Sequence, residues 1–437
     1  MKSFLNLLKN RNFVNLWGTQ LLTQLEISIV DFAVLIYVTE IYNSVFATAA
    51  VFAIQNIPAF AISLIAGIIG DFYDRRKILI YTNYLRAAVL IILLVSKSEL
   101  FFLYALVFIL AMLMFTYVTA ETATLKNVVK NDDLVLANTI FNITINVTTL
   151  VGAVFASLLY LWLGGAHQGG MEKIFGIGAV LFILAGVCST FLPKNINNYE
   201  ANVYIPKEKS TLTFFALSRN VAKYISETLN FITATPVIAV SIIHSILLQA
   251  GMFSIAAVAF KFAQDKLGVG TTGGAFYVII PATLGLSFGA MLSGGIAKKR
   301  GARFPAIVGG YIIASALIIL GILTLAIPNI TINTPIFWFL EFLIILSGFG
   351  ATFSQLPAQT VIHEQSVDEQ RSRIFGILNG ATFTVAGLLV LLISPIGDLL
   401  GGVSQFFIIV GLLTVIYMLV LGQKSKKIPK SEGRFSW

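Results

Sequence analysis

The chain has little charge. Of its 437 residues, only 11% are Asp, Glu, Lys or Arg, whereas 57% are hydrophobic. A soluble domain carries about 25% charged residues. Because so few charges cannot cover a globular surface, most of the surface of this protein must face lipid rather than water.

Cysteine is almost absent, and the common signatures of enzymes are missing. The single cysteine, Cys188, lies in an apolar run, which excludes an intrachain disulfide and a metal cluster built on thiolates. His363 and Glu364 are not followed by the second histidine of a zinc-binding helix. No phosphate loop is present, so ATP is not expected to drive the protein. We expect neither an enzyme nor a bound cofactor or metal.

Long apolar runs take up most of the chain. A membrane-spanning helix needs about 20 apolar residues. The sequence predicts spans near residues 12–40, 45–70, 77–96, 100–122, 134–163, 171–192, 236–262, 271–296, 304–327, 334–358, 372–396 and 401–422. The first run is too long for a signal peptide and is expected to remain as the first span. The predicted fold class is an all-α integral membrane protein of twelve transmembrane helices.

The net charge of +9 follows the membrane topology. In a soluble protein it would suggest nucleic acid as a partner, but here the basic residues gather in alternate short loops. The loops of the opposite side contain only Lys97, Lys173, Lys261 and Lys266. By the positive-inside rule, both termini are expected to be cytoplasmic, in a multi-pass protein of the cell membrane that binds no nucleic acid.

The two halves resemble distant copies of each other. Basic loops follow both the second and the eighth predicted span, and acidic-polar loops follow the fourth and the tenth. We expect an N-terminal six-helix bundle over residues 1–192, a linker over 193–235, and a C-terminal six-helix bundle with a basic tail over 236–437. Such pseudo-symmetric halves place a substrate site between them near the bilayer midplane.

The linker contains a predicted amphipathic helix near residues 211–232, with apolar and charged side chains on opposite faces. A helix of this kind lies in the membrane interface. It is interpreted either as a passive tether or as a segment that couples the two halves.

The segment after the second span reads GIIGDFYDRRK, residues 67–77. Gly67 allows close helix packing, and Asp71 near a helix end can accept hydrogen bonds from the N-terminus of another helix. Asp74, Arg75 and Arg76 follow, and basic side chains there anchor the loop at the anionic leaflet. This pattern resembles the loop signature of the major facilitator superfamily, in which it implies a latch on the cytoplasmic gate. A purely topological origin of the basic cluster is an equally good interpretation.

Further features narrow the resemblance. They are Asn10 to Phe13 before the first span, Leu16-Trp17 and Pro58 within the first two spans, the Asp74-Arg75-Arg76 variant, and Leu125 to Leu134 followed by Ala137-Asn138. Together they resemble the drug:proton antiporter branch that includes macrolide efflux proteins, siderophore exporters and the lysophospholipid transporter. The resemblance implies a fold of two six-helix bundles that alternate access by rocking.

Ionisable residues inside spans cost about 2.5–3.5 kcal/mol each on insertion scales, so they point to function. Asp31 shares a helical face with Gln20 and Gln24, and this face is polar enough to line a cavity. A carboxyl group in a low-dielectric cavity favours its protonated form, which suits reversible proton loading. Asp31 is the first candidate for binding a proton or a cationic substrate. Glu26 is the second, and it points about 140° away from Asp31 around the helix.

Three other intramembrane groups are weaker candidates. Glu341 is interpreted as a structural carboxyl group near the outer mouth. His244 near Gln249 either titrates or donates a structural hydrogen bond. Arg86, in the third span, either extends to the interface or pairs with an acid of the gate, and we group it with the gate motif.

These features predict a monomeric secondary transporter that exports a hydrophobic or amphipathic small molecule, drug-like or macrolide-like, at the expense of a proton gradient. Its partners are the substrate, protons and membrane lipids. One alternative is a transporter of lysophospholipid or another lipid with the same fold. Another is a scaffold or receptor that transports nothing, although such a protein has no need for costly intramembrane acids.

Overall fold

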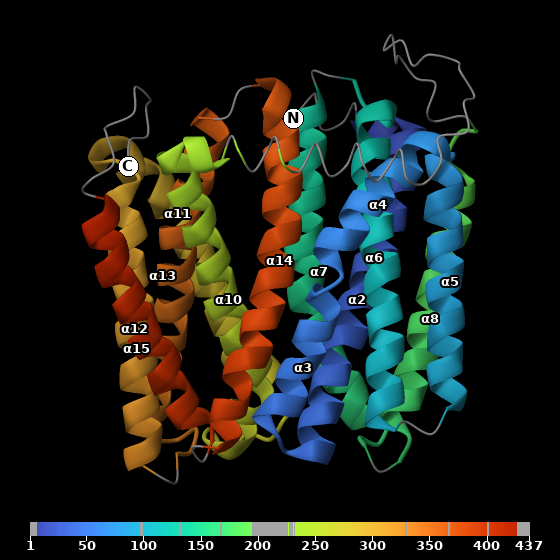
Figure 1. Ribbon diagram of the computed structural model, residues 1–437. Coiled ribbons are helices and arrows are strands. Elements are labelled where there is room, and N and C mark those ends of the chain that lie inside the picture. The colour runs from blue at the N-terminus through green and yellow to red at the C-terminus, as the bar shows by residue number, and fades with distance from the viewer. Residues whose placement is uncertain are drawn as a thin grey trace. The chain divides into compact units, whose positions relative to one another are not determined.

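The computed structural model describes residues 7–96, 99–130, 133–166, 168–194, 226, 230, 232–327, 330–365, 368–399 and 402–425. Within these ranges, only the backbone is described at residues 67–72, 135, 363–365, 368–379, 397, 424 and 425. The described chain is helical and contains no strand (Figure 1). The predicted linker helix near 211–232 and the basic tail beyond 425 fall almost entirely outside these residues.

The first six predicted spans form seven helices. They are α2 (Arg11–Tyr42), α3 (Val45–Asn56), α4 (Ala59–Phe72), α5 (Arg75–Val95), α6 (Leu100–Val128), α7 (Leu134–Trp162) and α8 (Gly170–Thr190). The later six spans form α10 (Pro236–Asp265), the π-helix η3 (Ala275–Ile279), α11 (Ile280–Arg300), α12 (Arg303–Ala326), α13 (Pro335–Gln365), α14 (Asp368–Leu399) and α15 (Val403–Ser425).

The helices account for all twelve predicted spans. Among the described residues, eleven helical segments are long and apolar enough to cross a membrane, the pair α3–α4 counting as one. The twelfth is α14, whose apolar part is Gly380–Ile396. The predicted fold class is therefore confirmed.

Proline accounts for the two places where the helices depart from simple spans. Pro58 lies at the break between α3 and α4, and Pro281 follows the π-helical turn that opens α11. A proline has no N–H to donate and its ring crowds the preceding turn. The chain therefore changes its helical geometry at these points without leaving the membrane.

Local hydrogen bonds fix where α2 begins. Asn10 is its N-cap, and its side-chain oxygen accepts hydrogen bonds from the backbone N–H groups of Asn12 and Phe13 at 3.1 and 3.3 Å. Its amide also donates to the carbonyl of Val128 at 2.7 Å. The side chain of Asn10 thus accepts from backbone N–H groups that have no partner within α2, and it links the start of α2 to the end of α6.

The helices divide into two compact units. The first comprises Met1–Ala201 and Ala257–Ile280, and the second comprises Asn202–Ala256 and Pro281–Trp437. The last turns of α10 therefore belong to the first unit. There the buried Lys261 donates to the carbonyl and the side-chain oxygen of Asn43, at 2.8 and 2.6 Å, and forms an ion pair with Asp265 at 3.1 Å.

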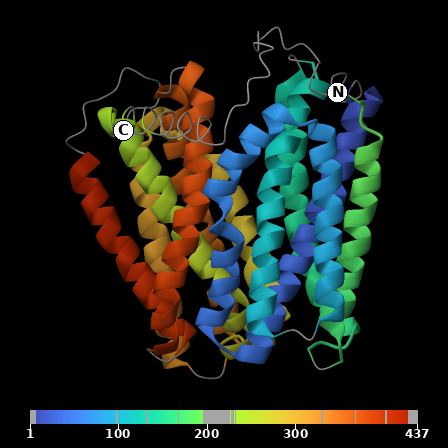
Figure 2. The same ribbon diagram turned by 45° about the vertical axis from the view of Figure 1, so that its right-hand side comes forward.

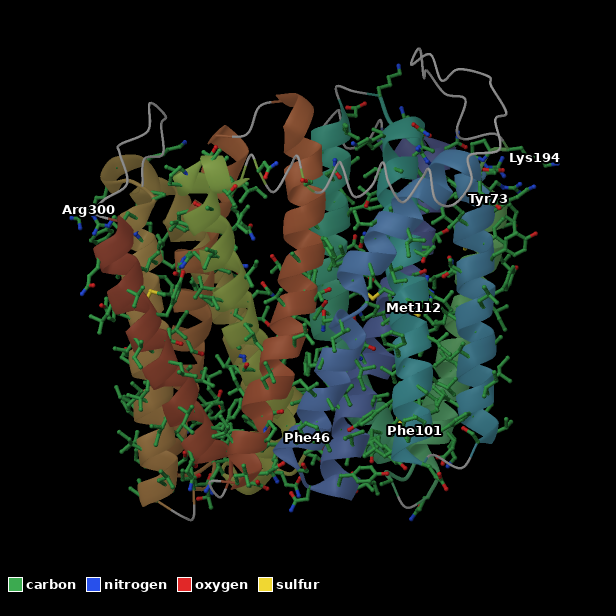
Figure 3. All side chains as sticks on the ribbon, in the orientation of Figure 1. Phe46, Tyr73, Phe101, Met112, Lys194 and Arg300 are labelled. Atoms are coloured by element: carbon green, nitrogen blue, oxygen red, sulfur yellow. The ribbon has the colours of Figure 1, made fainter. Side chains whose placement is uncertain are left out.

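In the first unit, α2 packs against α7 and α8, and α5 packs against α6 and α8. Figures 1 and 2 show α5 and α8 side by side. Tyr73 and Lys194 lie at one end of this unit, Phe46 and Phe101 lie at the other, and Met112 lies about midway between them (Figure 3). The loop after the second span and the residues after the sixth span therefore lie on the same side. This placement agrees with the even number of spans that separates them.

In the second unit, α12 packs against α13 and α15. Glycines bring α11 and α13 into backbone contact. A Cβ atom placed on Gly285, Gly289 or Gly348 would overlap a backbone carbonyl of the facing helix. Small residues at this spacing permit close approach of two helices.

Candidate functional site

A small cavity inside the first unit contains the two acids of α2. Asp31 and Glu26 both line it, together with Gln55 of α3 and Arg86 of α5. Ala111 and Met114 of α6 also line it, and they flank Met112, which lies midway along the unit (Figure 3). The acids therefore lie at mid-depth, with apolar side chains forming most of the wall.

Asp31 is half-buried and has one described side-chain partner. The amide nitrogen of Gln55 donates to its carboxyl oxygen at 2.8 Å. Gln55 lies in the last turn of α3, just before the break at Pro58. An amide can donate to the carboxyl group in either protonation state, so this contact orients Asp31 and still permits it to exchange a proton.

Glu26 is more deeply buried, at 1% exposure. One of its carboxyl oxygens has no hydrogen-bond partner among the described residues. Space for this oxygen comes from Gly178 of α8, where an added Cβ would lie 2.9 Å from it and 2.8 Å from a methyl group of Leu90. A buried oxygen without a partner is costly unless the group is protonated or binds a water molecule.

Arg86, which the sequence groups with the gate motif, lies beside these acids. It is eleven residues beyond Arg75 in α5, which corresponds to roughly 16 Å along the helix. Its guanidinium lies between the rings of Tyr117 and Phe182, 4.6 and 4.5 Å from their centroids. It is 1% exposed and is within electrostatic range of Glu26 and Glu121. The stacked rings compensate part of the cost of burying the charge.

A chain of polar contacts surrounds Arg86. Its Nη2 atom donates to Asn83 at 2.9 Å, and Asn83 also accepts from Thr23 of α2 at 3.3 Å. The hydroxyl of Tyr117 donates to the carboxyl group of Glu121 at 2.7 Å. One guanidinium nitrogen, Nη1, has no hydrogen-bond partner among the described residues. The cavity therefore contains an unpaired buried donor and an unpaired buried acceptor.

The size of the cavity limits what it can bind. Its volume is about 40 Å³, and one water molecule needs roughly 10–15 Å³ on the same measure. It has room for a few water molecules and for the protons that they carry. It is too small for a drug-sized molecule, for which pockets are roughly 300–1,000 Å³.

The remaining residues of the predicted polar face of α2 lie elsewhere. The side-chain amide of Gln20 is directed at α7, where it donates to the carbonyl of Phe141 at 3.4 Å. Gln24 accepts a hydrogen bond through its backbone carbonyl from Ser28. Neither lines the cavity of Asp31 and Glu26.

His244 and Glu341 lie in the second unit, whereas the acids of α2 lie in the first. His244 is fully buried between α13 and α15, with Nδ1 2.9 Å from the hydroxyl of Tyr417 and Nε2 3.1 Å from that of Ser354. The predicted neighbour of His244, Gln249, instead accepts from Gln355 at 2.9 Å. Glu341, in the second turn of α13, is 7% exposed, and one of its oxygens has no hydrogen-bond partner in the part of the chain that the structure describes.

The residues of the gate motif have structural contacts. Asp74 is the N-cap of α5 and accepts from the backbone N–H of Arg76 at 3.0 Å. Arg75 donates to the carbonyl of Ala123 near the end of α6, and Arg76 donates to that of Thr190 at the end of α8. Cations placed there complement the negative ends of helix dipoles. Gly67 and Asp71 lie in the last two turns of α4, but their side chains are outside the described set.

A second and larger cavity lies within the second unit. It has a volume of about 300 Å³ and is lined mainly by aliphatic residues of α10, α12, α14 and α15. The sequence does not reveal this cavity, because aliphatic residues in a span carry no signal that separates a cavity wall from a packed core.

An all-helical bundle of membrane spans with a buried cluster of acids and an arginine is typical of a transporter. Residues 16–326 match the sequence profile described as Major Facilitator Superfamily. Because this match covers more than half of the chain, the chain belongs to the major facilitator superfamily of transporters. A search of curated protein sequences finds no match.

Solved structures agree with this assignment at the level of the fold. A POT family transporter in complex with a thioalcohol-conjugated peptide is 12% identical, with a TM-score of 0.74 over 96% of this chain and 97% of that one. A bacterial homolog of the human lysosomal transporter Spinster, inward-facing and unoccupied, is 15% identical, with a TM-score of 0.73 over 97% and 100%. A mutant of the nucleoside transporter NupG is 13% identical, with a TM-score of 0.69 over 94% and 98%.

Proposed function

We propose that this transporter exports a hydrophobic or amphipathic small molecule in exchange for protons, by alternating access of its two halves. The observation that carries the proposal is the pair of carboxyl groups, Asp31 and Glu26, on one water-sized cavity beside a buried Arg86. An acid that alternately holds and releases a proton in such a place changes the charge balance of the cluster. That change can be coupled to a change of conformation.

In this proposal Asp31 exchanges the proton, because it is less buried than Glu26 and is held only by an amide. Arg86 holds a permanent positive charge near Glu26, so the two acids lie in different electrostatic surroundings. Asp71 of the gate motif latches the cytoplasmic side in one state. The protein acts as a monomer in the cell membrane with both termini cytoplasmic, and the proton gradient takes the place of a cofactor.

A second candidate function is the transport of a lysophospholipid or another lipid. The apolar cavity of the second unit favours it, since a wall of aliphatic residues suits a hydrocarbon chain better than a polar drug. Both candidates share the proton site in the first unit and differ in the substrate.

A substrate screen in proteoliposomes tests the proposal. Purified protein is reconstituted with a pH-sensitive dye inside the vesicles, and erythromycin or lysophosphatidylethanolamine is added under an imposed pH gradient. We expect one of the two to move protons only in vesicles that contain the protein. Proton movement with erythromycin alone supports drug export, and proton movement with the lysolipid alone supports lipid transport. Transport that proceeds at the same rate with and without the pH gradient would contradict proton coupling.

A further inference from the structure

The cavity of the second unit lies at mid-membrane depth. Its wall includes Gly251 of α10, Ile313 of α12, Ala351 of α13 and Thr414 of α15. Each of these residues is near the middle of its helix, since the helices span Pro236–Asp265, Arg303–Ala326, Pro335–Gln365 and Val403–Ser425. At this depth the surroundings of a membrane protein are hydrocarbon.

The polar groups on the wall already have hydrogen-bond partners. The hydroxyl of Ser254 donates to the carbonyl of Ala250 at 2.8 Å, and that of Thr414 donates to the carbonyl of Val410 at 2.7 Å. The hydroxyl of Tyr417 pairs with Nδ1 of His244 at 2.9 Å. A buried water molecule needs two to four polar partners. The hydroxyl donors of Ser254 and Thr414 are used within their own helices, and most of the wall is aliphatic, so an apolar occupant suits the cavity better than water.

The cavity reaches the surface of its unit. Leu247 and Leu413 line it and are 36% and 47% exposed. Both lie within spans, so the cavity reaches the surface of its unit at the depth of the acyl chains of a bilayer.

Gly251 marks unfilled space on the wall. A Cβ atom added to it would have no neighbouring heavy atom within 4 Å. By contrast, an added Cβ on Gly285, Gly289 or Gly348 would overlap the neighbouring helix. A side chain added at Gly251 would therefore enter open space on the wall of this cavity.

We propose that this cavity binds one hydrocarbon chain of an amphipathic molecule. About 300 Å³ is at the lower end of the range of small-molecule pockets, roughly 300–1,000 Å³, which suits a single chain better than a bulky ring system. The chain belongs either to a phospholipid of the surrounding bilayer or to a free single-chain amphiphile. The proposal does not depend on proton coupling or on the direction of transport.

Photolabelling with mass spectrometry tests this inference. The full-length protein is placed in phosphatidylcholine nanodiscs with one of two probes. The first is phosphatidylcholine with a diazirine in its acyl chain, and the second is palmitic acid with the same diazirine. The variant Gly251→Leu fills the cavity. Gly294→Leu is the matched control, because Gly294 also has no atom within 4 Å of an added Cβ and does not line the cavity.

We expect label in peptides containing residues 247–255 and 410–417. In Gly251→Leu the label should fall by roughly tenfold, because the new side chain takes the volume of the bound chain. In Gly294→Leu it should be unchanged. Labelling by the phospholipid probe alone assigns the site to a bilayer lipid. Labelling by palmitic acid, with competition by excess oleic acid, assigns it to a free amphiphile.

Absence of label in these peptides with both probes, or equal label in the two variants, would overturn the inference. If Gly251→Leu does not fold, the unmodified protein is labelled with and without excess oleic acid. The inference is overturned if oleic acid does not reduce the palmitic acid label and the phospholipid probe gives no label. The variant Asp31→Asn should keep its label whether or not it still couples transport to protons. Failure of the cavity and failure of the proposed function are thus distinguishable.

Discussion

At the scale of single residues, the buried acid of α2 depends on a missing side chain in α8. Gly178 leaves the space that Glu26 fills, and Val30 of α2 and Leu90 of α5 close the same space. The absence of a Cβ at this position therefore permits a carboxyl group to lie among tightly packed helices.

We expect Gly178→Val to displace Glu26 and to destabilise the protein by about 1–3 kcal/mol, because the new methyl groups overpack the site. Gly176→Val, in the same helix, is the control, since an added Cβ there lies 3.9 Å from its nearest neighbour, Leu94. Thermal unfolding in detergent measures both. Equal melting temperatures for the two variants would contradict the assigned role of Gly178.

Arg86 and Glu26 should show energetic coupling. Arg86→Met removes a buried charge from between two rings and leaves nearby acids without their cation, which typically costs about 3–5 kcal/mol. Adding Glu26→Gln should recover part of that loss, because the neutral amide no longer needs the cation. A double-mutant cycle on unfolding measures the interaction, expected at about 0.5–3 kcal/mol. Additive losses would show that the two groups act independently.

The two acids could be predicted from the sequence as candidate site residues. A carboxyl group inside an apolar span costs free energy on insertion, which points to a function for it. The partners of the acids could not be predicted. Gln55, Asn83 and Tyr117 are ordinary residue types, and only the packing of α3, α5 and α6 brings them to the site. The angle of about 140° between Asp31 and Glu26 argues against a direct carboxylate pair. Both acids line one cavity, because side chains from several helices surround this part of α2.

At the scale of helices, the contact between α11 and α13 depends on glycine. The variant Gly289→Leu should lower the melting temperature strongly, because its side chain would collide with the backbone at Phe349 and with Thr352. Gly294→Leu, in the same helix, should be tolerated because no atom lies near. Thermal unfolding of both variants in detergent is the measurement. A similar loss of melting temperature in both variants would mean that any large side chain in α11 destabilises the protein, and that the close approach of α11 to α13 is not the cause.

The helices were largely predictable, since each span is a long apolar run bounded by polar residues. Their irregularities were less so. Pro58 was visible in the sequence, but the resulting break that sets Gln55 at the end of α3 was not. The sequence predicts that the basic cluster of the gate motif anchors a loop. It does not reveal that Arg75 and Arg76 also bind the ends of α6 and α8, because these contacts depend on where distant helices end.

At the scale of the whole molecule, the chain is organised as two packed units, and α10 contributes to both. The predicted boundary at residue 236 follows the order of spans along the chain. The packing instead assigns Ala257–Ile280 to the first unit, where Lys261 binds Asn43. A division by sequence symmetry does not detect such an assignment, because it depends on contacts between residues more than 200 positions apart.

The cavity of Asp31 and Glu26, which we propose as the proton site, and the apolar cavity lie in different units. This division suggests separate roles, with proton exchange in the first unit and apolar binding in the second. Coupling between them then requires a change of conformation that both sites influence.

The most direct test of proton coupling compares two kinds of transport by Asp31→Asn in proteoliposomes. The substrate is erythromycin or lysophosphatidylethanolamine, according to which one the unmodified protein transports. Accumulation driven by an imposed pH gradient should be lost, because the amide cannot exchange a proton. Exchange of labelled for unlabelled substrate, without a gradient, should continue. Gradient-driven accumulation by Asp31→Asn equal to that of the unmodified protein would contradict the account.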